Sequence, residues 1–299
     1  MVYKETLGEK WFTISNYLFL ILFGCSTVYL FFYILVLSFN DGIDALKGGI
    51  YFWPREFTLA NYQTAFGNPN IMSAFRLSVL RAGVGTFLSV LLTSMAAYAL
   101  LRKDLPGRKY IIFYCFFTTL FSGGIIPLYM LYKEIGLINS IWIYIIPGMY
   151  SFFNIIIIRT YFENIPHSLS ESARMDGAGD LRIFFQIYLP LSKPVLATIA
   201  LFVAVAHWND WVTGAFFVNN PDLIPAATLL QKVLAETSFE ANAMQQSMNS
   251  DLMAKAVSNT TPEALRMAFV IIVTIPVLCV YPFLQKYFVQ GVMIGSIKE

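Results

Sequence analysis

Six long apolar segments, separated by polar or charged stretches, dominate the pattern of residues along this chain. A helix that crosses the hydrocarbon core of a bilayer needs about 20 mostly apolar residues. The segments that reach this length run from about Tyr17 to Phe39, Ser78 to Leu101, Tyr110 to Tyr132, Ile141 to Arg159, Pro194 to Val218 and Leu265 to Phe288. The first is too long for a signal-peptide core and lacks a convincing A-x-A cleavage site after it, so we expect it to be retained. The pattern predicts an all-α integral membrane protein with six transmembrane helices in a single domain over residues 1–299.

The composition agrees with a membrane protein and excludes several other classes. Hydrophobic residues make up 57% of the chain and charged residues only 13%, against about 25% charged residues in an ordinary soluble domain. The net charge of +2 gives no basic surface for nucleic acid. No G-x-x-x-x-G-K-[ST] sequence is present, so a partner chain would have to bind any ATP that the protein uses.

The basic residues indicate which side of the membrane each loop faces. With a cytoplasmic N-terminus, the inside segments and span ends carry twelve basic residues, which are Lys4, Lys10, Arg102, Lys103, Arg108, Lys109, Arg159, Arg174, Arg182, Lys193, Lys286 and Lys298. The outside segments are longer and carry seven, which are Lys47, Arg55, Arg76, Lys133, Lys232, Lys255 and Arg266. Because cytoplasmic loops of membrane proteins are enriched in Lys and Arg, we expect both termini in the cytoplasm.

One inward-facing loop, about Tyr161 to Lys193, is much longer than a helix connection requires. Ser168 with Glu171 three residues later has the form of a capping box, which predicts a helix that ends at Gly177 in a left-handed cap. Asp180 is placed to cap a second helical turn, from Leu181 to Ile187, that stops before Pro190. Ser192 and Pro194 then open the fifth span. The loop is therefore predicted to be a rigid elbow of two short helices.

The residues of this elbow resemble a known motif. Glu171-Ser172-Ala173, three residues, Gly177, nine residues and then Ile187-Tyr188-Leu189-Pro190 are similar to the cytoplasmic motif E-A-A-x3-G-x9-I-x-L-P. That motif belongs to the permeases of binding-protein-dependent ABC importers. The sequence departs from it at Ser172, where alanine is usual, and serine is nearly as small.

The resemblance extends over most of the chain, towards the carbohydrate-uptake branch with its maltose-permease-G-like and LplC-like members of bacteria. The segments that carry it are Ala97–Arg102, Leu105–Arg108, Asn164–Pro166, Ser170–Glu171, Trp208–Trp211 and the tail Phe288–Ile297 with Gly291 and Gly295. The resemblance implies a type I ABC importer permease fold, a multi-pass place in the bacterial cell membrane, and no enzymatic activity in this chain.

The resemblance also implies partners and a mechanism. In the family the elbow is a cytoplasmic coupling helix that docks on an ATPase dimer, which binds ATP and Mg. The residues that match this docking site are Glu171, Ser172, Ala173, Asp176, Gly177, Ile187, Leu189 and Pro190. The other implied partners are a second homologous permease and an extracytoplasmic solute-binding protein. The outer loop from about Asn219 to Ala264 is placed to contact the binding protein, with a mere connection as the alternative. In the other outer loop, about Asn40 to Leu77, the aromatic residues Tyr51, Phe52 and Trp53 are placed to lie flat at the membrane interface instead. The implied function is ATP-driven uptake of a sugar or oligosaccharide.

A polar group, His207-Trp208-Asn209-Asp210-Trp211, interrupts the fifth apolar segment. Its polar side chains suit hydrogen bonds between helices, and its tryptophans suit either a sugar path or the membrane interface. His207 and Asp210 share a helical face, but two ligands are weak evidence for a metal site. The substrate-path candidates are therefore Trp208, Asn209, Asp210 and Trp211, with inter-helix bonding as the first alternative.

Three other functions are weighed against the importer. An ion-coupled secondary transporter needs a charge within a span, for which Asp210 is the candidate, and it leaves the elbow without a role. An intramembrane enzyme needs a motif such as G-x-S-x-G or H-E-x-x-H, and the sequence contains neither. An ABC permease for a non-sugar solute stays open, and the sequence does not identify which sugar is carried.

Overall fold

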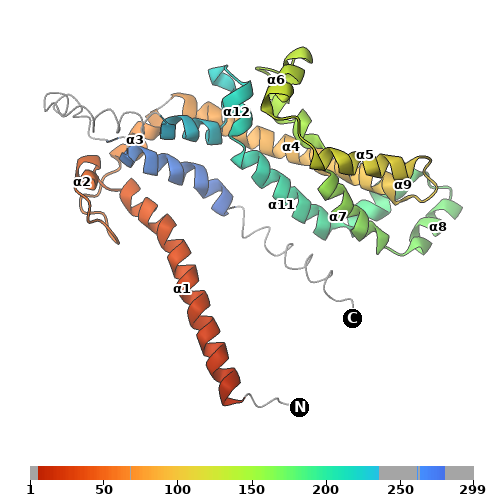
Figure 1. The fold of residues 1–299 in the computed structure, drawn as a ribbon, viewed down its shortest axis with the longest axis horizontal. Coiled ribbons are helices and arrows are strands. Elements are labelled where there is room, and N and C mark those ends of the chain that lie inside the picture. The colour runs from red at the N-terminus through yellow and green to blue at the C-terminus, as the bar shows by residue number, and fades with distance from the viewer. Residues whose placement is uncertain (1–5, 68, 236–260, 262, 280–299) are drawn as a thin grey trace. The chain divides into compact units, whose positions relative to one another are not determined.

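The computed structural model describes residues 6–67, 69–235, 261 and 263–279. Within these ranges the chain is helical, and the β pairing found there is one isolated antiparallel bridge between Asn40 and Phe57. The predicted all-α class is thereby confirmed. The chain divides into two compact units, residues 1–68 with 232–274 and residues 69–231 with 275–299. Each unit is described by itself below (Figure 1).

The first unit is built on one long apolar helix, α1 (Leu7–Ser38), which is 32 residues long. Its start is fixed by a capping box, in which the Thr6 backbone N–H donates to the Glu9 carboxylate at 2.7 Å and the Glu9 N–H donates to the Thr6 hydroxyl at 3.4 Å. Only Val36 and Ser38 of this helix are buried. Apolar residues exposed all round a helix are typical of a membrane span, and α1 corresponds to the first predicted segment.

Short elements close the first unit after α1. They are α2 (Gly42–Leu46) and α3 (Ala60–Gly67), and a further helix begins in this unit and covers residues 263–279. The side-chain amide of Asn61, which is fully buried, donates to the backbone carbonyls of Ser38 and Asn40 at 3.0 and 2.9 Å. The first bond satisfies a carbonyl group that the end of α1 leaves without a helical partner, and the second holds the chain just beyond that end.

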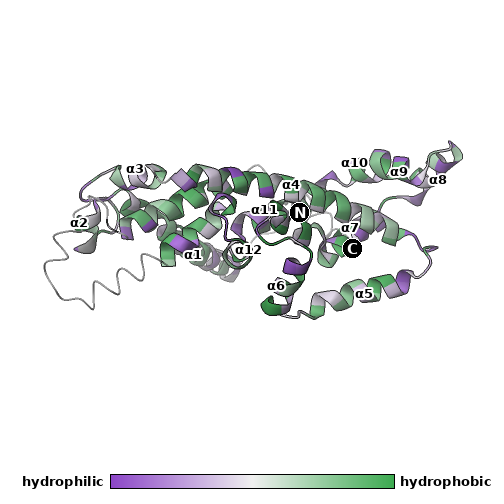
Figure 2. Cartoon of the chain, turned by 90° about the horizontal axis from the view of Figure 1, so that it is seen from above, coloured by the Kyte–Doolittle hydropathy of each residue, from purple (hydrophilic) through white to green (hydrophobic). Residues whose placement is uncertain are grey.

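The second unit is organised around α4 (Pro69–Leu101), with α11 (Lys193–Asn209) beside it and α7 (Phe152–Glu163) also packed on it (Figure 1). Small or short side chains line the buried side of α4, and they include Gly85, Ser89, Thr93, Ser94 and Ala97. Such residues allow helix backbones to approach closely where no hydrophobic effect drives association. Figure 2 shows hydrophobic residues along α4 and α11, and hydrophilic residues at α8.

The remaining described elements of the second unit are shorter. They are α5 (Arg108–Leu120), α6 (Ile125–Glu134), η1 (Ile141–Tyr144), η2 (Ile146–Met149), α8 (His167–Met175), α9 (Asp180–Ile183), η3 (Phe184–Tyr188), α10 (Leu189–Leu191), α12 (Val212–Phe217), η4 (Pro221–Leu223) and the helix Ala226–Ala235, which runs on into the first unit.

Several predicted spans are bent or broken helices. The segment predicted from Tyr110 to Tyr132 contains α5 and α6, which meet at 119° across a break where Gly124 has φ +86°. The segment predicted from Ile141 to Arg159 combines 3₁₀ turns with α7 at 46°. By length and composition, two described helices qualify as spans, or up to five if each bent pair is one span. The sixth segment extends beyond residue 279 and thus outside the described residues, so the count of six remains a prediction.

Candidate functional site

The elbow begins with α8, which forms where expected but starts differently. The helix begins at His167 directly after Pro166, and no side-chain hydrogen bond caps it. The predicted capping box of Ser168 and Glu171 is therefore wrong, because Ser168 already lies within the helix. Pro166 sets the entry instead, with φ −56° and ψ 125°, and its ring fixes φ near this value.

The end of α8 is built as predicted. Gly177 adopts φ +79°, the left-handed conformation that favours glycine. The N–H of Gly177 donates to the carbonyl of Arg174 at 3.0 Å, and the N–H of Ala178 donates to the carbonyl of Ala173 at 2.9 Å. These two bonds form a Schellman motif, which satisfies the last carbonyls of the helix and turns the chain in a defined direction.

The second arm of the elbow is longer than predicted. Asp180 is the first residue of α9 after the cap residue Gly179, so its predicted role as a cap is wrong. The helix also does not stop before Pro190, because it continues through the π-helical turn Phe184–Tyr188 and α10 to Leu191. A wider π turn changes the bonding pattern just ahead of a proline that has no N–H to donate. The predicted start of the next span is confirmed, with Ser192 at the cap and Pro194 in the first turn of α11.

The underside of the elbow is anchored in the main hydrophobic core of the second unit. Ile183, Phe184 and Tyr188 are buried, and the Tyr188 ring lies 5.0 Å from the ring of Tyr98 and 5.2 Å from that of Phe162. The half-buried residues that pack against the same core include Ala173, Ala178, Ile187 and Leu189. Both arms of the elbow are therefore held by apolar contacts and cannot swing freely.

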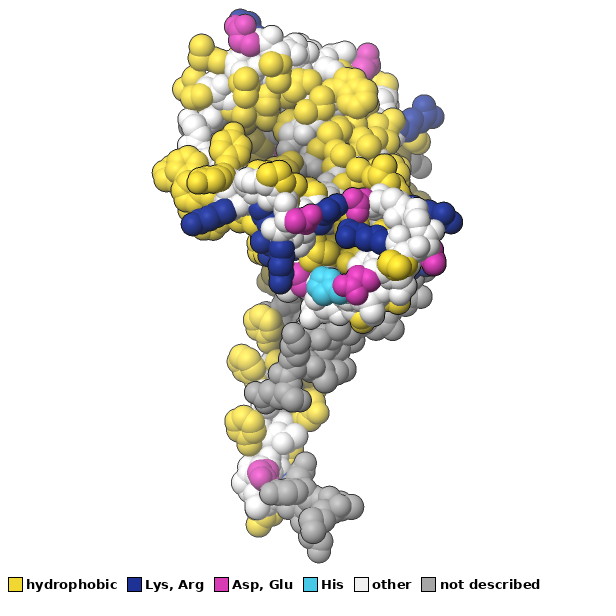
Figure 3. Space-filling model, turned by 90° about the vertical axis from the view of Figure 1, so that its right-hand side faces the viewer, with side chains coloured by type: hydrophobic (Ala, Val, Ile, Leu, Met, Phe, Trp, Pro, Cys, Tyr) yellow, Lys and Arg dark blue, Asp and Glu magenta, His cyan; other side chains and the backbone are white. Residues whose placement is uncertain are grey.

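A group of charges ties the elbow to the end of α4. Arg102 forms ion pairs with Asp104 at 2.8 Å and with Asp180 at 2.5 Å, and Arg174 also bonds to Asp180 at 3.1 Å. The hydrogen bond between Arg102 and Asp104 raises the pKa of the guanidinium and lowers the pKa of the carboxyl group. Figure 3 shows basic and acidic side chains gathered at the end of the second unit that carries α8. Asp180, expected to cap a helix, instead joins three segments.

The predicted docking residues fall into two groups. Glu171, Ser172, Asp176, Gly177 and Pro190 are exposed, whereas Ala173, Ile187 and Leu189 face the core and hold the elbow in place. Glu171 lines a cleft of about 500 Å³ together with Arg102, Lys103 and Arg174, and no ion pair to it is found within the described part of the chain. The exposed group forms the surface that a partner can contact.

Sequence reasoning did not include Met175 among the docking residues and did not connect Arg102 with the elbow. Met175 lies at the tip of α8 with 89% of its surface exposed, which is unusual for a large apolar side chain. In the sequence Met175 lies one helical turn after Glu171 and next to Asp176, which would have placed it on the docking side of α8. The role of Arg102 depends on Asp180, 78 residues later, so sequence spacing gave no sign of it.

A second candidate site is a cavity of about 540 Å³ between α4, α7, α11 and the 3₁₀ turns. Its polar lining includes Ser89, Asn154, His207 and Asp210. Aromatic residues, among them Tyr144, Tyr150, Phe153 and Phe202, form much of the rest. Polar groups that converge in a membrane cavity with aromatic walls can bind a polar solute.

Beside this cavity, Arg81 of α4 holds the break between α11 and α12. Its fully buried guanidinium donates to the backbone carbonyls of Asp210 and Trp208 at 2.7 and 3.3 Å, and lies 3.7 Å from the Asp210 carboxylate and 5.1 Å from the centre of the Tyr144 ring. Asp210 in turn accepts the N–H of Thr213 at 3.1 Å, at the start of α12. A cation at the carbonyl end of a helix is favoured by the helix dipole.

The His207 side chain fits between two glycines. A Cβ atom placed on Gly85 would lie 2.5 Å from Nε2 of His207, and one placed on Gly148 would lie 3.0 Å from its Cε1. Only glycine permits such close approach of the backbone to a ring. His207 therefore forms a tightly packed wall of the cavity.

The predicted substrate-path residues are separated by the fold. Asp210 lines the cavity, whereas Trp208 is buried against Phe75, with ring centres 6.1 Å apart, and Asn209 and Trp211 are exposed outside the lining. The alternative of inter-helix bonding describes Asp210 well, because its partner Arg81 lies on another helix. Among the described residues, no group of three or more potential metal ligands occurs.

We expect Gly85→Ala to destabilise the protein by about 1–3 kcal/mol, because the added methyl group must displace His207. Gly83→Ala is the matched control, since no described heavy atom lies within 4 Å of its added Cβ, and alanine favours a helix. The unfolding midpoint of the purified protein in detergent measures both. Equal midpoints for the two variants would show that His207 can be displaced without loss of stability.

We expect Arg81→Gln to cost more stability than Asp210→Asn. Arg81→Gln removes the charged donor that bonds to the carbonyls of Trp208 and Asp210, which should cost about 2–4 kcal/mol of stability. Asp210→Asn leaves both of those bonds in place and should cost about 1 kcal/mol. Unfolding midpoints of the two variants test this order. A larger loss in Asp210→Asn would mean that the ion pair, and not the carbonyl bonds, stabilises the break.

Comparison with known proteins gives a consistent result. The family described as "Binding-protein-dependent transport system inner membrane component" matches residues 6–294. The polygalacturonan/rhamnogalacturonan transport system permease protein YtcP of Bacillus subtilis is 38% identical over 293 residues, which cover 98% of this chain and 100% of that protein. Protein LplC of the same organism is 36% identical over 294 residues, which cover 98% of this chain and 97% of that protein.

The crystal structure of a bacterial ABC transporter involved in the import of the acidic polysaccharide alginate contains a chain that matches with TM-score 0.84 and 28% identity, covering 96% of this chain and 100% of that one. With the elbow, the helical fold and a family match over nearly its whole length, this chain belongs to the inner membrane components of binding-protein-dependent transport systems, the permease subunits of ABC importers.

Proposed function

We propose that this permease carries a sugar or oligosaccharide, delivered by an extracytoplasmic solute-binding protein, and that a separate ATPase drives it through the elbow. The carbohydrate cargo is supported by the names of similar proteins, since YtcP is named for polygalacturonan and rhamnogalacturonan and the similar crystal structure is of an alginate importer. As a permease subunit the chain is a transport protein and not an enzyme, which sets aside the secondary transporter and the intramembrane enzyme.

The geometry of the elbow is the observation that carries the proposed coupling. Its Schellman turn at Gly177, its apolar underside and its Arg102–Asp180 ion pair make it a rigid part of the second unit. Its exposed side presents Glu171, Ser172, Met175 and Asp176. A rigid projection passes a movement of its partner to the helices that it joins, whereas a slack loop would absorb it.

The composition of the complex and its orientation extend this proposal. The partners are a second homologous permease and a dimer of ATPase subunits, and ATP and Mg are bound on that dimer. Both termini and the elbow lie in the cytoplasm, which the excess of basic residues on that side supports. Most of the second outer loop, at residues 236–260, and the tail Phe288–Ile297 lie outside the described residues.

The cavity beside α4 and α11 is the proposed part of the solute path in this subunit. Sugars combine hydroxyl groups, which need hydrogen-bond partners, with apolar ring faces that pack on aromatic side chains. The cavity offers Asn154, Ser89 and Asp210 for the first and Tyr144 and Tyr150 for the second. Of the candidates drawn from the sequence, Asp210 is kept in this role.

We expect Gly177→Val to abolish most solute uptake while the protein still inserts and assembles. A β-branched residue at φ +79° is strained by about 1–2 kcal/mol or more, which turns the elbow out of its docking geometry. Gly177→Asn is the matched control, because asparagine tolerates this conformation. Uptake and solute-stimulated ATP hydrolysis in proteoliposomes measure the effect, and full uptake by Gly177→Val would contradict the proposal.

We expect Asn154→Leu to lower uptake about tenfold or more, because it replaces the side-chain amide in the cavity wall by an apolar group of similar volume. Thr118→Val is the control, since Thr118 is exposed on α5 and its hydroxyl bonds to the carbonyl of Cys115 in its own helix. Transport at matched amounts of inserted protein compares the two. If Asn154→Leu transports normally, the cavity is not on the solute path.

A further inference from the structure

An uncharged loop in the first unit, Gly48 to Pro54, presents three consecutive aromatic residues. Tyr51, Phe52 and Trp53 are 61%, 69% and 81% exposed. We call this segment the aromatic loop. Charged residues occur on either side of it, at Lys47 and Arg55, and none lies within it. Three large aromatic side chains next to one another in water are costly, at about 25 cal/mol for each Å² of apolar surface.

The aromatic loop folds back along α1 and away from the end of that helix. The hydroxyl of Tyr29 donates to the backbone carbonyl of Tyr51 at 3.4 Å, and the rings of Tyr29 and Phe52 have centres 5.6 Å apart. Tyr29 precedes Ser38, the last residue of α1, by nine positions, which is about 13 Å along a helix axis. The loop therefore lies level with the apolar body of α1.

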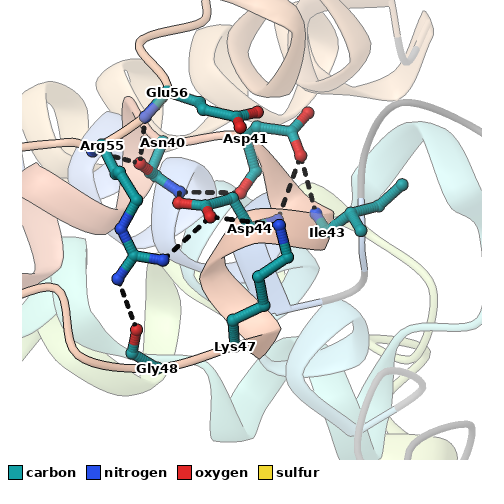
Figure 4. Close-up of polar contacts among 8 residues, drawn as sticks. All are labelled: Asn40, Asp41, Ile43, Asp44, Lys47, Gly48, Arg55 and Glu56. Carbon is teal, nitrogen blue, oxygen red and sulfur yellow. Dashed lines mark hydrogen bonds and ion pairs between the residues drawn. The ribbon is translucent and has the colours of Figure 1, made fainter.

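A polar cluster built on the buried residues Asn40 and Asp44 fixes this position (Figure 4). Arg55 donates to the Gly48 carbonyl at 2.9 Å and to the Asp44 carboxylate at 3.0 Å, so it closes the base of the loop. The Asn40 side chain accepts the N–H groups of Arg55 and Glu56 at 2.7 and 3.1 Å and donates to Asp44 at 3.2 Å. Asn40 is fully buried and Asp44 is 2% exposed. The loop is thus held rigidly from its base.

The length of α1 indicates where this loop meets the membrane. At 32 residues the helix is about 48 Å long, longer than a hydrocarbon core of about 30 Å. Trp11 is exposed near the start of α1. Tyr29 and Tyr33 follow it by 18 and 22 residues, which is about 27 and 33 Å along the helix axis. Aromatic residues of this kind gather at both interfaces of a bilayer. The aromatic loop lies level with Tyr29, the second of these two bands.

We propose that the aromatic loop binds the lipid interface on the side of the membrane where α1 ends. Tyr51, Phe52 and Trp53 lie among the headgroups and the first acyl carbons, beside Tyr29. The last two turns of α1 and the cluster of Asn40, Asp44 and Arg55 then stand outside the hydrocarbon core, so this placement ends the first span near Tyr33, earlier than the Phe39 expected from the apolar pattern. Lipid is the occupant because the exposed apolar surface of the loop continues that of α1, with Val28 and Leu30 exposed close by. The inference depends on α1 crossing the membrane and not on the proposed cargo.

Spin labels at single cysteines test this placement in the whole transporter, reconstituted in nanodiscs of phosphatidylcholine and phosphatidylglycerol. The background replaces Cys25, Cys115 and Cys279 by serine, and labels are placed at Phe52→Cys and, separately, Trp53→Cys. Both labels should collide with oxygen several times more than with the water-soluble nickel complex NiEDDA. A label at Glu56→Cys, also exposed but beyond Arg55 and outside the aromatic loop, should show the reverse ratio.

Two further variants test whether the cluster of Asn40, Asp44 and Arg55 holds the aromatic loop in place. Arg55→Gln should lower the oxygen preference of the Phe52→Cys label, because it removes the bonds to Gly48 and Asp44. Lys47→Gln is the matched control, since Lys47 also pairs with Asp44, but at 3.5 Å and from an exposed position, so the label should not change. If the oxygen preference of this label is unchanged in Arg55→Gln, the bonds of Arg55 do not hold the loop in place.

The proposal is overturned if the labels at Phe52→Cys and Trp53→Cys meet NiEDDA as readily as the Glu56→Cys label does. Should that access be lost on addition of the solute-binding protein, the aromatic loop docks on protein and not on lipid. Two label positions guard against a single substitution that disturbs the loop.

Discussion

Backbone groups that leave a helix within a membrane need a partner, because hydrocarbon offers no water to replace the lost hydrogen bonds. In the second unit the break between α11 and α12 meets this requirement through Arg81, which donates to the carbonyls of Trp208 and Asp210. Asp210 satisfies the other side of the break through the N–H of Thr213 and lies near the guanidinium as its counter-ion. This arrangement allows an irregular helix to line a cavity at a depth where an uncapped break would be costly.

At its other end the same unit holds the connection between α7 and α11, the elbow, in a rigid form. The elbow has a backbone turn that glycine permits at Gly177, an aromatic underside around Tyr188, and a charged attachment through Arg102 and Asp180. Each kind of contact acts on a different side of the segment. The attachment joins the elbow to the end of α4, the helix that also carries Arg81 and Gly85, and in the proposed function a movement of α8 is passed along this connection.

The first unit meets a different constraint, which is the match of a long helix to a thin membrane. α1 exceeds the thickness of a hydrocarbon core, and its final turns pack with the residues that follow it. Asn61 bonds to the carbonyl of its last residue, Ser38, and Asn40, Asp44 and Arg55 form a polar cluster beyond the apolar body. Aromatic residues separate these two environments, as they do in membrane proteins generally.

The sequence by itself determined the class of the protein, the place of the elbow and the family. Apolar segment length reports membrane spans directly, and Gly177 and the spacing of the elbow motif are local features, so both could be read from the chain. The same local reasoning misplaced the start of α8 and the role of Asp180, because a capping pattern competes with Pro166 and with ion pairs from elsewhere.

Only the tertiary structure decided how the cavity is built. Arg81 meets Asp210 across 129 positions, and His207 fits between Gly85 and Gly148. The bends in the segments from Tyr110 and from Ile141 were likewise not predicted, although the pair Gly123 and Gly124 marks the first break in the sequence. Hydrophobicity in a membrane protein reports contact with lipid or core at each position, but it does not report which polar groups find one another. That pairing depends on helix packing between residues far apart in the chain, and it decides where the membrane contains a cavity.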